Sequence, residues 1–314
     1  MLYILANRAL VSCRCCPLSS NLRPQTLPID MRTLAGRNWY YDFREINVAF
    51  SEASCERVAA SLLERYSKLT KAWSPELNSE WTCRLFMAAK LVMSSTLHVN
   101  AAHFAEDRNL RVVVPYLRYY SVLSLLRAVC YTLPEHEWKD GQLIQIPHGK
   151  AIDGALVHLR RFDKTVADSA ETEMRELKAE RELISYRAPS SGDDQVSEKN
   201  QFLSLCMLLA EVAQFNSELF ESSLLKHADS AHFRILSEYA EQIASVEIDG
   251  HYFGDREDAH RLGYLARKQP YPVNMQHFMK EGHVDDFFGS WVADEESEEF
   301  FNPDKMQHII FDIP

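Results

Sequence analysis

Glycine is scarce in this sequence, and its scarcity excludes several large enzyme classes. The chain has ten glycines in 314 residues, and none lies between Gly36 and Gly141. Phosphate-binding loops, dinucleotide-binding turns and nucleophile elbows need glycine at fixed spacings, because the backbone there turns tightly or approaches a ligand closely. The patterns G-x-G-x-x-G, G-x-x-x-x-G-K-[ST] and G-x-S-x-G are all absent. The sequence therefore predicts no enzyme that depends on one of these loops.

An excess of basic over acidic residues occurs only in the first segment of the chain. The formal net charge is −11; residues 1–29 carry three arginines and no acid, whereas residues 281–314 carry ten acids against Lys305 alone. The intervening residues 30–280 have a net charge of only −5. Proteins that wrap nucleic acid are usually strongly basic. We therefore expect a protein partner or self-association, and nucleic-acid binding is disfavoured.

Cysteine usage points to reduced thiols. The seven cysteines are an odd number with no repeated spacing; three crowd the N-terminus at Cys13, Cys15 and Cys16, and the others are isolated. This usage indicates a cytoplasmic protein. No second C-x-x-C completes a zinc site with Cys13 and Cys16. We predict no metal and no cofactor.

No membrane span is predicted, because Arg118 and Arg127 interrupt the most apolar stretch. Residues 1–30 are set apart by their acid-free start and the second methionine that follows, Met31. Three interpretations of this segment stay open: an organellar targeting leader, a lipoprotein signal that ends at Cys13, or a disordered or mis-assigned start.

Apolar residues recur every three or four positions through most of the chain, which is typical of amphipathic helices. The fold class predicted is mainly α, a multi-helix bundle in a helical domain over 31–245. Helices are expected at 54–73, opened by Ser54, at 79–103, opened by Ser79, and at 115–133, 150–162, 169–186, 202–219 and 233–243. The helix over 115–133 is apolar around most of its circumference, so we place it at the centre.

A small β element is expected from the terminal segments. Residues 44–50 alternate polar and apolar side chains, and 306–313 form a second candidate strand that would pair with them. Residues 246–253 read as a hairpin about Asp249 and Gly250. The segment 246–314 is therefore a hairpin followed by an acidic, aromatic C-terminal tail.

One cluster of basic residues falls within fourteen positions: His148, Lys150, His158, Arg160 and Arg161. Such a group suits phosphate binding or acid–base chemistry on RNA. The interpretation that we prefer is ordinary helix-end charge, in which Arg160 and Arg161 pair with acids such as Glu171 or Glu173.

The helix that follows closes on an arginine-led motif from Arg181 to Arg187. In this respect residues 52–225 resemble the HEPN ribonucleases, whose signature is an arginine followed after four to six residues by a histidine. Here Arg187 takes the place of that histidine, and arginine stays protonated at neutral pH, so it is no general base. The resemblance implies at most an inactive relative that contacts RNA or phosphate.

The E-x-x-H spacing at Glu257 and His260 puts a carboxylate and an imidazole on one helix face. Di-iron bundles use this motif twice, with further glutamates. The only partner is an imperfect D-x-x-H at Asp229 and His232, so we expect surface neighbours rather than a metal site.

Rings are mixed with acids in the tail, at Phe287, Phe288, Trp291, Phe300 and Phe301. Disordered acidic segments are normally poor in aromatics. We therefore expect the tail to dock on a cationic surface, with Arg160 and Arg161 as the nearest candidates by charge. Two functions follow as hypotheses: a helical protein that acts by binding a protein or ligand, and an RNA- or phosphate-directed enzyme that uses the His/Lys/Arg cluster.

Overall fold

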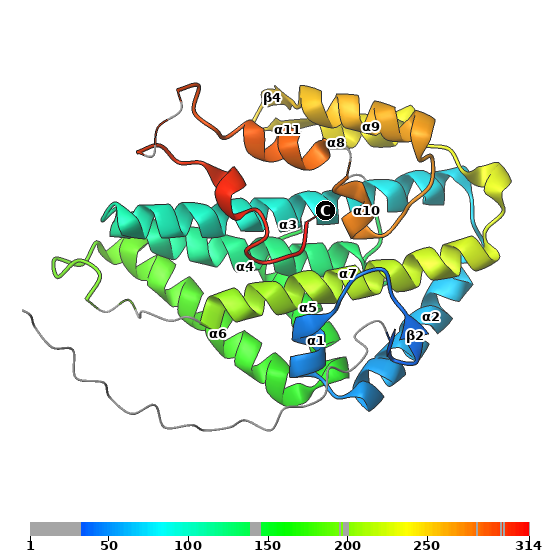
Figure 1. Ribbon diagram of the computed structural model, residues 1–314, viewed down its shortest axis with the longest axis horizontal. Coiled ribbons are helices and arrows are strands. Elements are labelled where there is room, and N and C mark those ends of the chain that lie inside the picture. The colour runs from blue at the N-terminus through cyan, green and yellow to red at the C-terminus, as the bar shows by residue number, and fades with distance from the viewer. Residues whose placement is uncertain are drawn as a thin grey trace, which may run out of the picture.

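The computed structural model describes residues 33–138, 146–194, 196, 201–280, 282–295, 297 and 299–313. Residues 1–30 lie outside this part, so the three interpretations of that segment stay predictions. Of the described residues, 69% are helical, in eleven α-helices, with two small two-stranded sheets (Figure 1). The prediction of a mainly α, multi-helix fold is confirmed.

The helices are α1 (Arg44–Ala49), α2 (Glu52–Thr70), α3 (Pro75–Asp107), α4 (Val114–Tyr131), α5 (His148–Phe162), α6 (Lys164–Glu182), α7 (Gln201–His227), α8 (Ser237–Ala244), α9 (Arg256–Lys268), α10 (Met275–Phe278) and α11 (His283–Gly289). Single turns η1 (Arg111–Val113), η2 (Leu183–Arg187), η3 (Ser230–His232) and η4 (Pro303–Met306) connect or flank them, η2 being a π-turn. The strands are β1 (Thr33–Leu34), β2 (Arg37–Asn38), β3 (Ser245–Ile248) and β4 (His251–Gly254).

Helix α4 lies at the centre of the bundle, as its composition predicts. It packs against α3, α5, α6 and α7, and Val122, Leu123 and Leu126 are buried. Residues 111–131 are long and apolar enough to cross a membrane, but 61% of the tested window is buried inside the protein. A helix surrounded by other helices has this same apolar circumference, so packing in the core accounts for the composition.

Two helix starts differ from the prediction, because serines earlier in the chain provide the caps. Ser51, not Ser54, caps α2 by accepting the Ser54 N–H, and Ser74 caps α3 by accepting the Leu77 N–H at 3.2 Å. Pro75 follows Ser74, and proline suits the first helical position because its nitrogen has no hydrogen to satisfy. Ser79 lies one turn inside α3, where its hydroxyl donates to the Pro75 carbonyl.

The buried guanidinium of Arg84 ties α3 to the end of α4. It donates to the carbonyls of Tyr131 at 3.0 Å and Leu133 at 2.6 Å, and it stacks 4.1 Å from the ring centroid of Trp81. The last carbonyls of a helix have no intrahelical partner. Arg84 therefore provides partners that α4 cannot supply for itself.

The strand predicted at 44–50 is wrong, because this segment contains helix α1. The carboxylate of Glu211 on α7 accepts the backbone N–H groups of Arg44 at 3.0 Å and Ile46 at 2.9 Å, which caps α1 from outside. Ile46 is buried, whereas Val48 is 85% exposed. Glu218, two turns further along α7, holds the N–H groups of Tyr40 and Tyr41.

The hairpin predicted over 246–253 is confirmed. Strand β3 pairs with β4 in antiparallel register, with Val246 opposite Phe253 and Ile248 opposite His251. Asp249 and Gly250 both have positive φ, 51° and 80°. This is the backbone pattern of the tight turns that an Asp-Gly pair favours.

The strand predicted at 306–313 is also wrong, and no sheet joins the two terminal segments within the described residues. The segments do meet, but through side chains. The rings of Tyr41 and Phe311 stack with centroids 4.5 Å apart, and the Asp312 N–H donates to the Tyr41 hydroxyl. Apolar residues before and after position 245 belong to one hydrophobic core.

Candidate functional site

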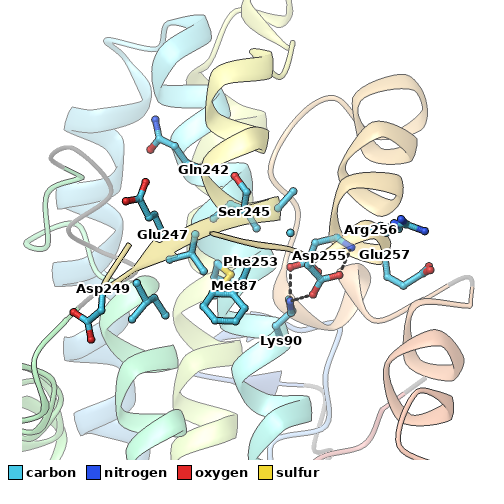
Figure 2. Close-up of a pocket in the computed structure, with 16 residues that line it drawn as sticks. Met87, Lys90, Gln242, Ser245, Glu247, Asp249, Phe253, Asp255, Arg256 and Glu257 are labelled. Atoms are coloured by element: carbon cyan, nitrogen blue, oxygen red, sulfur yellow. Dashed lines mark hydrogen bonds and ion pairs between the residues drawn. The ribbon is translucent and has the colours of Figure 1, made fainter. Parts of the chain in front are cut away.

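An open cleft lies between α3, the β3–β4 hairpin and the start of α9. We call it the hairpin lobe; its volume is about 940 Å³ (Figure 2). Its apolar lining comes from Met87 on α3, Ile243 on α8, and Val246, Ile248 and Phe253 on the hairpin. Polar and charged groups surround this lining.

A second cleft, the tail lobe, adjoins the first along α3. It has a volume of about 470 Å³ and extends between α3, α9 and α11 to Trp291. Both lobes share five lining residues: Met87, Lys90, Asp255, Glu257 and Asp258. The two lobes therefore form one elongated site that is divided by this shared group.

An ion-pair cluster makes the division. The Lys90 ammonium contacts the Asp258 carboxylate and lies 3.6 Å from that of Asp255, as the dashed lines beside Lys90 indicate (Figure 2). Asp255 also caps α9, because its other oxygen accepts the Asp258 N–H at 3.0 Å. Burial raises the pKa of Asp258, and Lys90 partly opposes that rise.

The rim of the joint cleft is acidic. Six carboxylates line the two lobes, from Glu247, Asp249, Asp255, Glu257, Asp258 and Asp286. Three cations face them, from Lys90, Arg256 and Arg261, which leaves an excess of three negative charges. The two histidines of the tail lobe add no compensating charge near neutral pH, since burial lowers the pKa of His98 and lowers that of His283 to about 4.

The hairpin presents its two faces differently. Val246, Ile248 and Phe253 share one face by their register and line the cleft. Phe253 lies close to Met87 in Figure 2 and remains 56% exposed. Tyr252 is on the opposite face and is 73% exposed. An apolar ring that lines a cleft and yet stays half exposed is available to a ligand.

The aromatic tail residues are divided between the cleft and the core. Phe287 and Trp291 line the tail lobe, with Trp291 57% exposed. Phe288 is fully buried, Phe300 is largely exposed, and Phe301 packs edge-on against Phe104 with centroids 5.6 Å apart. The tail therefore anchors by some of its rings and offers others to the cleft.

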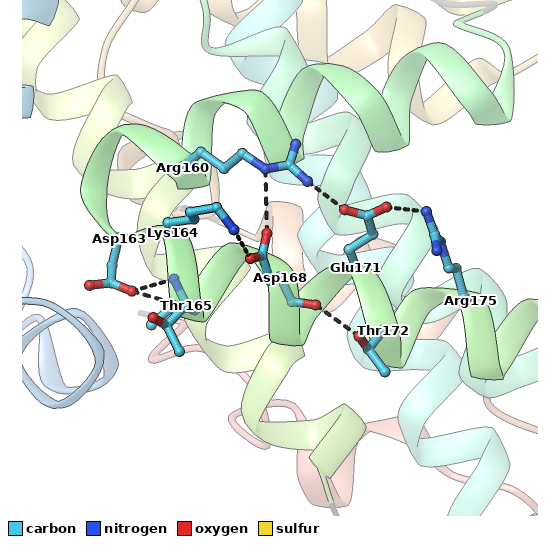
Figure 3. Close-up of polar contacts among 9 residues, drawn as sticks. Arg160, Asp163, Lys164, Thr165, Asp168, Glu171, Thr172 and Arg175 are labelled. Carbon is cyan, nitrogen blue, oxygen red and sulfur yellow. Dashed lines mark hydrogen bonds and ion pairs between the residues drawn. The ribbon is translucent and has the colours of Figure 1, made fainter.

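Arg160 and Arg161 do not receive the tail, so that part of the docking hypothesis is wrong. Arg160 ion-pairs with Glu171 and Asp168 (Figure 3), and Arg161 lies 2.7 Å from Glu135. These pairs follow the preferred interpretation of helix-end charge, with Glu171 as a predicted partner. The tail instead packs on α3, where the Asn100 amide donates to the carbonyls of Pro303 and Met306.

The other members of the basic cluster are spread along α5. His158 is buried, its Nε2 donates to the Asn216 side-chain oxygen at 3.1 Å, and burial lowers its pKa to about 3. His148 is at the other end of the helix and contacts the Tyr119 hydroxyl at 3.0 Å, while Lys150 is exposed. Arg187 is exposed at the end of η2. The structure does not bring His148, Lys150, His158 and Arg161 to one point.

No group of three His, Cys, Asp or Glu side chains suited to a metal ion occurs among the described residues. Glu257 lines both lobes, whereas His260, its partner in the E-x-x-H motif, is exposed. Cys55, Cys83, Cys130 and Cys206 are buried free thiols, and burial raises the pKa of each.

Comparison with known proteins adds no family. The chain matches no protein-family model, and no curated protein or solved structure is significantly similar to it. A function can therefore be proposed only from the residues of the site itself.

Lys90 and Asp258 were not identified as site residues from the sequence, although the sequence around each of them is unusual. Lys90 interrupts an otherwise apolar stretch of α3, and Asp255 and Asp258 are three apart at a helix start directly after the hairpin. A lone lysine in a buried stretch needs a carboxylate partner, but nothing in the sequence says which one.

Proposed function

We propose that this chain is a binding protein whose joint cleft takes a basic peptide with an apolar face. The observation that carries the proposal is the combination of an apolar floor with an acidic rim in one open site. Met87, Ile248 and Phe253 provide apolar area, and the excess of three negative charges selects a cationic partner. Complementary charge of this kind steers association and discriminates against acidic partners.

The arrangement favours a peptide over a compact small molecule. The two lobes adjoin along α3 and share the lysine–aspartate group between them, so the site is elongated. An amphipathic helix places apolar side chains at intervals of three and four residues, which suits such a groove. Lysine or arginine on its flanks would meet Asp249 at one end and Asp286 at the other.

The enzyme hypothesis receives less support. It required His148, Lys150, His158 and Arg161 to converge, and they lie along a helix with separate partners. His158 is buried within the core. Binding remains the function that the geometry supports best.

Fluorescence anisotropy with a fluorescein-labelled helical peptide of leucine and lysine tests the proposal. The same peptide with glutamate in place of lysine is the control probe. We expect the lysine peptide to bind and its affinity to fall as salt screens the acids. Phe253→Ser and Glu257→Lys should each weaken binding, whereas Tyr252→Ser, on the opposite face of the hairpin, should not. Equal binding of both peptides, or equal loss in Phe253→Ser and Tyr252→Ser, would show that the cleft is not the site.

A further inference from the structure

A second site is suggested where α4, α6 and the first turn of α5 meet. The Tyr119 hydroxyl lies 3.0 Å from Nδ1 of His148, and the Arg181 guanidinium lies 4.6 Å from the centroid of the Tyr119 ring. Tyr120 packs edge-on against His148 with centroids 6.1 Å apart. Tyr119 therefore holds a histidine from α5 and an arginine from α6 at one place. These two residues are 33 positions apart in the sequence.

The first turn of α5, which follows Pro147, lacks a side-chain cap and an acidic residue of its own. The first N–H groups of an α-helix have no intrahelical acceptor and carry partial positive charge. A methyl group built on Gly149 would meet nothing within 4 Å, so no described atom packs against that side of the turn. The N–H groups of a helix start are able to bind an anion.

The side chains around the turn carry net positive charge. Arg127, Lys178 and Arg181 are close enough to lower the pKa of His148, after burial as the largest cause. Glu182 is the acid beside them; it lies 3.3 Å from Arg181 and 3.8 Å from Lys178. Three cations and one carboxylate leave an excess of two positive charges. The Arg181 Nε is buried without a hydrogen-bond partner among the described atoms.

The geometry points to a binding site for the dianionic phosphate group of a small phosphomonoester, formed by the first turn of α5 with His148, Lys178 and Arg181. An excess of two positive charges matches a dianion better than the single charge of a phosphodiester. Helix N-termini and arginine side chains both bind phosphate oxygens. When Nδ1 of neutral His148 accepts from Tyr119, Nε2 carries the proton and donates to the ligand. This site is separate from the acidic cleft.

Proton NMR of the His148 imidazole tests the site, with phenyl phosphate as monoester, dimethyl phosphate as diester and sodium chloride at matched ionic strength. Phenyl phosphate should give a saturable shift and raise the pKa of His148, because the dianion stabilises the imidazolium. Dimethyl phosphate should bind at least about tenfold more weakly, and chloride should give no saturable shift.

Variants separate the site from general surface charge. Arg181→Gln should weaken phenyl phosphate binding at least about tenfold, the loss of one charge-assisted hydrogen bond. Lys178→Gln, at an exposed position that does not endanger folding, should weaken it severalfold. Arg175→Gln, an exposed arginine on the same helix that pairs with Glu171, is the matched control and should change binding less than about twofold. The proposal is overturned by an absent saturable shift, by equal binding of monoester and diester, or by equal losses in Lys178→Gln and Arg175→Gln.

Discussion

Replacement of Lys90 by methionine probes the group that divides the cleft. The Lys90 and Asp258 side chains are 19% and 8% exposed and are in direct contact. Methionine keeps most of the apolar stem of lysine and removes the charge. Asp258 is then left buried with Asp255 as its nearest charged neighbour, a carboxylate of the same sign. The variant therefore isolates the electrostatic role of the pair.

The expected loss of stability is about 3 kcal/mol at pH 7. Removal of one member of a buried ion pair costs about 3–5 kcal/mol, and the partial exposure of Lys90 places this pair at the lower end. The loss should depend on pH. Burial already raises the folded-state pKa of Asp258 above its unfolded value, and loss of Lys90 raises it further. The penalty therefore shrinks as the pH falls and the carboxyl group takes up a proton, and it grows as the pH rises.

Urea denaturation followed by far-UV circular dichroism at pH 4 and pH 7 measures this loss. Lys68→Met is the matched control, because Lys68 pairs with Glu64 on the surface of α2 at 2.8 Å and exposed pairs of this kind contribute little to stability. The double variant Lys90→Met/Asp258→Leu should recover most of the loss. A loss that is equal at both pH values, or no larger than that of Lys68→Met, would refute the reasoning.

Three further predictions concern the body of the fold. Leu123→Ala should cost about 2–5 kcal/mol in urea denaturation, because Leu123 is fully buried in α4; a loss below about 0.5 kcal/mol would be typical of a surface residue. Burial raises the pKa of Glu211 to about 7, above an unfolded value of about 4.3. The free energy of unfolding should therefore fall as pH rises from about 4.5 to 7, and Glu211→Gln should flatten that slope; an unchanged slope would contradict the assignment. Deletion of residues 1–30 should leave the melting temperature within about 2 °C, since the segment lacks apolar periodicity; a larger drop would mean that it packs on the body.

The sequence by itself determined the elements that are encoded by short-range patterns. The periodicity of the apolar positions placed the central helix α4, and the Asp249-Gly250 pair placed the hairpin turn, where two successive residues have positive φ. Both signals are local. A helix face or a tight turn is encoded within a few neighbouring positions, so it can be predicted without the rest of the chain.

The tertiary structure decided the elements and sites that depend on distant partners. Residues 44–49 form a helix because Glu211, more than 160 positions away, caps them, and the alternation of their side chains gave no sign of it. The tail forms no strand: Asn100 on α3 binds the carbonyls of Pro303 and Met306, and the Phe311 ring stacks on Tyr41. Lys90 and Asp258 meet across 168 residues, as His148 and Arg181 meet around one tyrosine. Each of these contacts joins groups that only the packing of the chain brings near, so composition and spacing cannot predict it.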